Sequence, residues 1–290
     1  IPLRLVGSEM CIRDSSGTMT WGQWGSKFTT NEMQYLIDQI VDLGINTFDH
    51  ADIYGGYTTE AAFGTAFNNS AVNRESVYFI SKCSIQMPCD ARSLPVKYYD
   101  YSAKHIRMSV ENSLRQLKTD YLDLLLFHRP SPLMNAETIA KVIQELKSEG
   151  KINQLGVSNF TPSQMQLLQQ EIDLKWNQLE CSLTQEKSLF DGTLDYMKIN
   201  NIGVMAWSPL GSFFKEKGVK NERVLKCMAS LCEKYNCTEG QLLLAWLLYH
   251  PSKIHPVVGT TSAKRLALSM AALDIKSVSY THLTLPTNRE

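Results

Sequence analysis

The sequence lacks several features that mark whole classes of protein. It has no excess of either charge, since 29 Lys and Arg residues stand against 29 Asp and Glu residues. Without a long run of one sign, a nucleic acid or an anionic membrane is not expected as the main partner. No apolar run approaches the roughly 20 residues that a membrane-spanning helix needs. The sequence therefore predicts neither nucleic-acid binding nor insertion into a membrane.

The cysteines also lack a pattern. The seven of them form no C-x-x-C pair and no Cys/His cluster with the spacing of a zinc site, so we expect reduced thiols and no metal. The first residues contain no basic region followed by a sustained apolar stretch, so no secretory signal is evident. These absences favour a cytoplasmic protein. The hydrophobic content of 43% indicates a globular chain with a sizeable core.

Two terminal segments do not continue the pattern of their neighbours. SEMCIRDS, residues 8–15, and SVSYTHLTLPTNRE, residues 277–290, have no helical or strand period, and both resemble translated sequencing-adaptor reads. We expect residues 1–16 and 277–290 to be non-native or disordered, with the folded domain at residues 17–276. Two ordinary irregular tails are the alternative. If the ends are non-native, native sequence is missing at both of them.

Between these ends, short apolar runs alternate with longer segments of helical period, which indicates repeated βα units. Clear helices are expected at residues 31–43, 102–117 and 135–148, the first with Thr30 as its N-cap. Without a linker between two halves, the pattern favours a single (β/α)8 TIM barrel. A doubly wound sheet is the alternative, but its G-x-G-x-x-G turn is missing. The eight predicted strands are at residues 18–21, 45–48, 77–81, 121–127, 154–157, 176–179, 203–207 and 254–258.

Four residues of acid/base type follow these strands. In a barrel the working side chains lie at the C-terminal ends of the strands. Asp49 and Tyr54 occur there in DHADIYG, Lys82 in FISKC, and His128 in LLLFHRP. Singly, each has an ordinary alternative as a turn residue, a solvated strand end or a packing residue. Together they are expected at one mouth of one barrel.

The order D-x-A-x-x-Y, strand-terminal Lys, strand-terminal His resembles the catalytic tetrad of the aldo-keto reductase superfamily. GVSNF, NQLE and AWSPLGS fall where that family has its cofactor loops, and the resemblance covers nearly all of residues 17–276. It implies a nicotinamide-dependent oxidoreductase that reduces an aldehyde or a ketone to an alcohol. Tyr54 would be the general acid, and Lys82 would stabilise its phenolate and lower its pKa. Asp49 would hold Lys82 in its charged form, while His128 would orient the carbonyl oxygen.

The same resemblance implies a cofactor site for NADPH, with NADH as the alternative. Ser158, Asn159 and Gln178 would bind the nicotinamide carboxamide, and Trp207 would stack beneath the ring. Small residues in the next loop would let backbone donors approach the pyrophosphate. This loop consists of Ser208, Pro209, Leu210, Gly211 and Ser212.

Two further segments complete the expected cofactor site. Thr18 and Met19 would touch the ribose and the nicotinamide edge. Gly259, Thr261 and Arg265 match the family's loop for the adenosine phosphate, and Arg265 would bind the 2′-phosphate. The basic residue that often stands at Thr261 or its neighbour in the family is missing here.

The substrate pocket is expected to include Trp21, Trp24 and Arg129, which favours aromatic or polar carbonyl compounds. The sequence does not identify the substrate or the oligomeric state. A regulatory subunit of the same family, with bound cofactor and little turnover, is the alternative function. His128 argues against it, because that group tends to lack this histidine. A metal or phosphate enzyme would need a carboxylate/His ligand set at the strand ends, which the sequence does not show.

Overall fold

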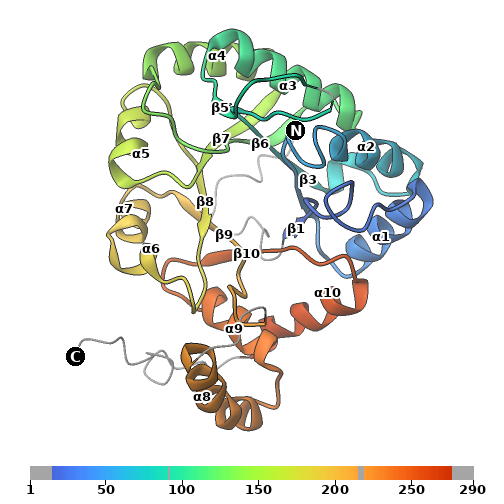
Figure 1. The fold of residues 1–290 in the computed structure, drawn as a ribbon, viewed down its shortest axis with the longest axis vertical. Helices are drawn as coiled ribbons and strands as arrows, with labels where there is room; N and C mark the ends of the chain where they lie inside the picture. Colours follow the sequence, from blue (N-terminus) through green and yellow to red (C-terminus); the bar gives the residue numbers. More distant parts are fainter. Residues whose placement is uncertain (1–14, 91, 215–218, 276–290) are drawn as a thin grey trace.

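Short strands, most of them apolar, alternate along the chain with helices, and the strands close into a barrel that the helices surround (Figure 1). The computed structural model describes residues 15–90, 92–214 and 219–275. Neighbouring barrel strands are parallel, and the predicted (β/α)8 TIM barrel is confirmed. The strands, in their order around the barrel, are β1 (Ser15–Gly17), β10 (Ile254–Val258), β9 (Gly203–Trp207), β8 (Trp176–Glu180), β7 (Ile152–Ser158), β6 (Leu122–Phe127), β3 (Tyr78–Cys83) and β2 (Thr47–Asp49).

Helices form the outer layer of the molecule (Figure 1). A small antiparallel pair, β4 (Ile85–Gln86) and β5 (Tyr98–Tyr99), lies outside the barrel sheet. The helices are α1 (Thr30–Asp42), α2 (Thr59–Asn69), η1 (Arg74–Ser76), α3 (Ala103–Leu117), α4 (Ala136–Ser148), α5 (Pro162–Gln169), α6 (Lys187–Phe190), α7 (Thr193–Ile199), α8 (Val219–Tyr235), α9 (Glu239–Leu248), α10 (Ala263–Met270) and η2 (Ala271–Asp274).

Two apolar layers hold the strands in place. Inside the barrel, six buried side chains pack against one another, so the barrel interior is a filled core and not a pore. A larger cluster lies between the strands and the helices, and it includes the apolar face of α1. The inner cluster consists of Ile80, Leu124, Leu126, Trp176, Met205 and Val257.

The first strand does not lie where the sequence predicts it. Residues 18–21 form turns, and the Trp21 N–H donates to the Thr18 carbonyl oxygen at 3.0 Å. The strand is Ser15–Gly17, which pairs with both β2 and β10. The barrel therefore begins two residues before the expected boundary. The predictions for residues 1–14 and 277–290 lie outside the described residues.

The predicted last residues of α3 and α4 are confirmed, while the predicted first residues, Ser102 and Asn135, are the N-caps and the helices begin one residue later. α1 also differs from the prediction. There the N-cap is Thr29 and not Thr30, because Thr29 accepts from the Glu32 N–H while the Glu32 carboxylate accepts from the Thr29 N–H. Pro162 opens α5 directly after the N-cap Thr161, where its fixed φ and missing N–H suit the first turn. In the described part of the chain, no helix has both the length and the apolar character needed to cross a membrane.

Candidate active site

Four polar side chains meet where neighbouring strands of the barrel end. Asp49 closes β2, Lys82 lies near the end of β3, and His128 directly follows β6. Tyr54 lies in the turns that follow β2. β2, β3 and β6 are consecutive in the barrel, so their carboxyl ends lie side by side. The structure thus brings together the four residues that the sequence predicts as a catalytic group.

Lys82 is the centre of this group. Its ammonium donates to Asp49 Oδ2 at 2.7 Å and to Tyr54 Oη at 3.2 Å. A third hydrogen bond, 2.8 Å long, goes to the His50 carbonyl oxygen, so all three donors are used. Burial acts to lower the pKa of Lys82, but the charges and hydrogen bonds of Asp49 and Tyr54 outweigh it and raise the pKa above its ordinary value. Lys82 is therefore a fixed cation beside the phenol.

Opposing effects set the pKa of the Tyr54 phenol. Burial raises it, the charge of Lys82 lowers it, and the charge of Asp49 raises it, so that the net pKa lies above that of a free tyrosine. Lys82 thus lowers the pKa of the phenol, as expected, but burial outweighs this effect. Near neutral pH the phenol carries its proton, and a cation lies at its oxygen to stabilise the phenolate that would remain after proton donation.

His128 faces Tyr54 edge-on, with ring centroids 6.0 Å apart and an interplanar angle of 80°. Burial lowers the pKa of His128 well below its ordinary value, and the positive charges of Lys82 and Arg129 lower it further. The imidazole is therefore neutral near neutral pH. A protonated phenol and a neutral imidazole at one mouth can hydrogen-bond the oxygen of a small substrate and give it a proton.

Glu60 is a buried carboxyl that the sequence does not single out, because an acid in the first turn of a helix usually lies in solvent. It accepts hydrogen bonds from Ser81 at 2.5 Å and from Ser113 at 2.9 Å. Burial raises the pKa of Glu60 to about 7, against the effect of these hydrogen bonds. Since Ser81 precedes Lys82 on β3, Glu60 ties the helix that follows Tyr54 to the strand that carries the lysine.

Asp52 fixes the other side of the Tyr54 segment. Its N–H donates to the Lys82 carbonyl oxygen at 3.0 Å, and its Oδ2 accepts from Ser109 on α3 at 2.7 Å. Burial raises the pKa of Asp52 to about 7. One feature of the sequence could have pointed to Asp52 and Glu60. The segment DHADIYGGYTTE contains three acids, whereas the proposed chemistry needs only one carboxylate. The second and third acids of that run hold the loop.

We expect Glu60→Gln to flatten the pH dependence of stability. Because the folded pKa is about 7 and the ordinary value is 4.5, the folded protein keeps a proton that the unfolded chain releases between these values. The free energy of unfolding therefore falls as the pH rises through this window, by at most about 3 kcal/mol for one carboxyl. Urea unfolding at the two ends of the window measures the difference.

Glu171→Gln, at an exposed position on the surface, is the matched control for this substitution. It should keep the wild-type dependence, while Glu60→Gln should lack the part that Glu60 contributes, since Asp52 and the buried histidines titrate alike in all three proteins. Equal pH dependence in the wild type and in Glu60→Gln would show that Glu60 does not titrate in this range.

Three of the predicted cofactor side chains, Ser158, Gln178 and Trp207, lie on β7, β8 and β9, which adjoin one another in the barrel, and Asn159 directly follows β7. Asn159 accepts from Trp207 Nε1 at 3.0 Å and donates to Ser158 Oγ at 2.7 Å. Gln178 donates to Asp49 Oδ1 at 2.9 Å. The indole ring is therefore fixed in place by Asn159, and the glutamine connects this side of the mouth to the acid/base group.

The loop after β9 turns sharply over residues 208–212. Ser208 and Gly211 have positive φ angles of 50° and 55°, and the Gly211 N–H donates to the Ser208 carbonyl oxygen at 2.7 Å. A side chain at Gly211 would collide with the hydroxyls of Ser182 and Thr184, so glycine is required. The Ser212 N–H donates to Thr184 Oγ1 at 3.3 Å. The N–H groups of Gly211 and Ser212 are therefore used within the structure, and sequence reasoning missed the Thr184 hydroxyl that holds the loop.

The loop after β10 lies beside it, because β9 and β10 pair in the barrel. At Gly259 no atom lies within 4 Å of where a Cβ would stand, so the backbone there is open. Thr261 is half-buried next to Ser262, the N-cap of α10. Arg265 Nε donates to Thr260 Oγ1 at 2.9 Å, which holds the exposed guanidinium at the start of this helix. A guanidinium at a helix N-terminus suits a phosphate.

The turns after β1 correct two predictions. Thr18 is fully buried, and its hydroxyl donates to the Asp49 carbonyl oxygen at 3.0 Å, so its side chain is not free to touch a ribose. Trp21 is 0% exposed and packs 6.0 Å from Phe63 and 6.3 Å from Phe48, ring centroid to ring centroid. Trp21 therefore belongs to the core between the barrel and α2, and the prediction that it lines the pocket is wrong.

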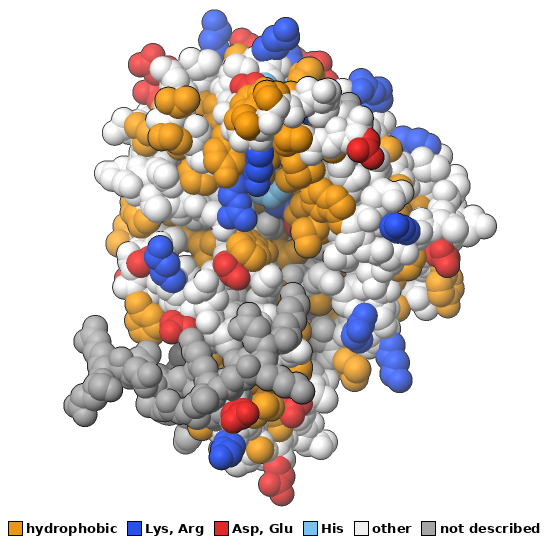
Figure 2. Space-filling model, in the orientation of Figure 1, with side chains coloured by type: hydrophobic (Ala, Val, Ile, Leu, Met, Phe, Trp, Pro, Cys, Tyr) orange, Lys and Arg blue, Asp and Glu red, His pale blue; other side chains and the backbone are white. Residues whose placement is uncertain are grey.

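Trp24 and Arg129, both predicted for the pocket, lie beside groups at the mouth. Trp24, 44% exposed, has its ring 6.2 Å from that of Tyr54. Met19 is 48% exposed, and its contact with the cofactor stays a prediction. The Arg129 guanidinium lies 5.6 Å from the Trp207 ring centroid. Figure 2 shows a hollow over the middle of the barrel, where a His and nearby Lys or Arg side chains are visible among hydrophobic ones.

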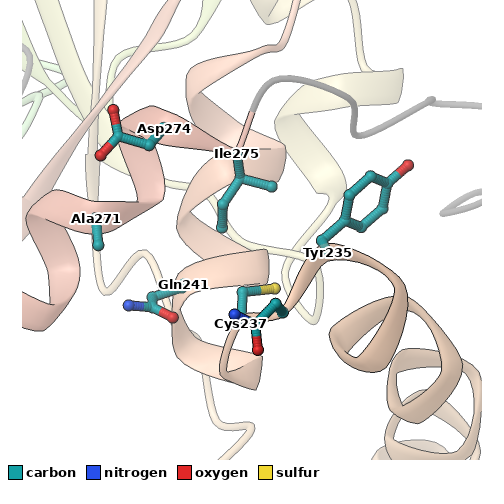
Figure 3. Close-up of a pocket in the computed structure, with 7 residues that line it drawn as sticks. Tyr235, Cys237, Gln241, Ala271, Asp274 and Ile275 are labelled. Carbon is teal, nitrogen blue, oxygen red and sulfur yellow. The ribbon is translucent and has the colours of Figure 1, made fainter.

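A separate pocket of about 270 Å³ lies on the outside of the barrel, between the end of α8, the start of α9 and η2 (Figure 3). None of the predicted site residues lines it. It is lined by Tyr235, Asn236, Cys237, Gln241, Ala271, Asp274 and Ile275. Among the described residues, no group of three or more His, Cys, Asp or Glu side chains is placed to hold a metal ion.

Comparisons with known proteins, by sequence and by structure, both lead to the aldo/keto reductases. The model of the aldo/keto reductase family matches residues 15–284. An uncharacterised oxidoreductase of Bacillus subtilis, YcsN, is 39% identical over 90% of this chain and 88% of its own length. A 6-dehydroglucose reductase of Agrobacterium fabrum is 37% identical over 89% of each protein.

Solved structures agree with the sequence relatives. An aldo/keto reductase from Klebsiella pneumoniae, in complex with NADP and acetate, has a TM-score of 0.75 at 25% identity and covers 93% of this chain and 88% of its own. A thermostable aldo-keto reductase bound to the inhibitor epalrestat has a TM-score of 0.81 at 24% identity, with 96% and 95% covered. The similarity to this thermostable enzyme is a similarity of fold.

Proposed function

Since the chain belongs to the aldo/keto reductase family, we propose that it reduces an aldehyde or a ketone to the alcohol with NADPH, or with NADH, as cofactor. The observation that carries the proposal is the buried Lys82 ammonium, which bonds both the Asp49 carboxylate and the Tyr54 hydroxyl. Three ionisable groups fixed in contact at the mouth of a barrel are arranged for proton transfer.

Each side chain has a defined part in the proposed reaction. The cofactor, when bound, supplies the hydride that the carbonyl carbon accepts. Tyr54 donates its proton to the carbonyl oxygen as negative charge grows there, and Lys82 stabilises the phenolate that remains. Asp49 keeps Lys82 charged and in place. His128, which is neutral, orients the carbonyl oxygen by a hydrogen bond.

The residues around the mouth fit a nicotinamide dinucleotide. Trp207, held by Asn159, offers a fixed ring face for the nicotinamide, and Ser158 and Gln178 lie beside it on β7 and β8. The turn at residues 208–212 would lie against the pyrophosphate. The NADP bound by the Klebsiella relative supports the same choice of cofactor here.

Arg265→Ala should weaken NADPH binding much more than NADH binding. The guanidinium at the start of α10 would bond only the 2′-phosphate, which NADH lacks, so the Kd for NADPH should rise by about 10- to 100-fold. The Kd for NADH should stay within about threefold. Fluorescence titration of both cofactors measures this, with Arg265→Lys as a variant that keeps the charge. An equal rise in the Kd values for NADPH and NADH would show that Arg265 does not bind the 2′-phosphate.

The experiment that tests the proposed function follows NADPH absorbance with a neutral aromatic aldehyde as the second substrate. Loss of absorbance with formation of the alcohol is the expected result. Binding of NADPH measured in the same preparation, without any turnover across a panel of aldehydes and ketones, would instead support a cofactor-binding regulatory protein.

A further inference from the structure

Arg129 holds a central position over the mouth of the barrel. It follows His128 at the end of β6, and its carbonyl oxygen accepts from the Tyr101 hydroxyl at 2.5 Å, which fixes its backbone. Its guanidinium reaches to within 5.6 Å of the Trp207 ring at the end of β9. β7 and β8 lie between β6 and β9 in the barrel, so the side chain extends over the mouth.

The charge of Arg129 acts on the groups proposed to do the chemistry. Its charge lowers the pKa of both Tyr54 and His128. Lys97 adds a second positive charge that acts on His128. The carboxylate of the acid/base group, Asp49, forms its ion pair with Lys82 and not with Arg129.

No carboxylate neutralises Arg129 within the part of the chain that the structure describes. The ion pairs found there all involve other cations, and the Arg129 side chain is half-buried beside an aromatic ring. A guanidinium in such a place gains most from an anionic partner that presents two oxygens, since its donors match that geometry.

We propose that Arg129 binds an anionic group of the substrate, so that the preferred substrates are aldehydes or ketones that also carry a carboxylate. The inference rests on the proposed carbonyl reduction. With the carbonyl oxygen at Tyr54 and His128, the carboxylate would lie against Arg129, and the body of the substrate would lie beside the ring of Trp24. Arg129 is thus a specificity-determining residue and not a proton donor.

The test compares two aldehydes that differ in one charge, 4-carboxybenzaldehyde and its methyl ester. In the wild type, kcat/KM should be about 10- to 100-fold higher for the carboxylate, the range that a charge-assisted hydrogen bond supports. Arg129→Gln should abolish most of this preference through KM, while any change in kcat that follows from the loss of its charge near Tyr54 should affect the two aldehydes equally. Arg129→Lys should retain part of it. The same change at an exposed helix position, Arg115→Gln, should leave the preference intact.

Different failures have different meanings in this test. Reduction of neither aldehyde would contradict the proposed function itself. Reduction of the ester with an equal kcat/KM for the carboxylate would leave the proposed function standing and overturn the role of Arg129. An unchanged preference in Arg129→Gln would do the same. Loss of both substrates together with weaker NADPH binding would assign Arg129 to the cofactor.

Discussion

Replacing Tyr54 with phenylalanine should lower kcat for carbonyl reduction by at least ~100-fold, the usual scale for the loss of a general acid. The substitution removes one oxygen atom from a buried ring and leaves the packing against Trp24 and His128 intact. NADPH binding should therefore stay within about threefold of the wild type. Steady-state kinetics with a neutral aldehyde, together with a fluorescence titration of NADPH, measure both quantities.

Tyr35→Phe is the matched control for this experiment. Tyr35 is 65% exposed on α1, where its hydroxyl accepts from Gln39, and its loss should not change kcat. Wild-type kcat in Tyr54→Phe would exclude Tyr54 as the proton donor. A loss of NADPH binding that accounts for the whole decrease would show that the hydroxyl serves the cofactor instead.

Lys82→Met should be comparably damaging to kcat, for an electrostatic reason. Lys82 lowers the pKa of Tyr54 by its charge and by its hydrogen bond, so its loss leaves burial and Asp49 to raise that pKa further. The acidic group in the pH profile of kcat should accordingly move to higher pH. A pH profile identical to that of the wild type would contradict the role of Lys82.

The same substitution leaves Asp49 buried without its cation, which should cost about 3–5 kcal/mol of stability. The double variant Asp49→Asn/Lys82→Met removes both charges, so it should regain most of the stability while kcat stays low. Chemical denaturation and kinetics on the three proteins therefore separate a catalytic effect from an unfolding effect. Recovery of kcat in the double variant would show that Lys82 acts only through stability.

The strands could be predicted from sequence wherever they are apolar. Residues 122–127 and 203–207 lie within predicted apolar runs, since a strand covered on both faces is hydrophobic along its length. β1 is Ser-Ser-Gly, so it carries no such signal, and its place is set only by pairing with β2 and β10. Similarly, Thr29 and Thr30 are chemically alike, and the reciprocal bond with Glu32 decides which one caps the helix.

The acid/base group could be predicted because topology brings the strand ends together, whatever the distance along the chain. The direction in which a side chain points could not be predicted in the turns after β1. Trp21 and Trp24 are three residues apart in the same turns, yet one is in the core and the other lies beside Tyr54. The buried state of Asp52 and Glu60 depends on serines of α3 and β3, which the local sequence does not reveal.

The most direct test of the central claim follows the hydrogen that the substrate receives. NADPH carrying deuterium at one or the other of the two hydrogens of the reactive nicotinamide carbon is incubated with the protein and an aldehyde, and the alcohol is examined by mass spectrometry. A fixed nicotinamide at Trp207 predicts deuterium on the former carbonyl carbon from one labelled form and none from the other. An alcohol without deuterium from either form, or no alcohol at all, would contradict the account.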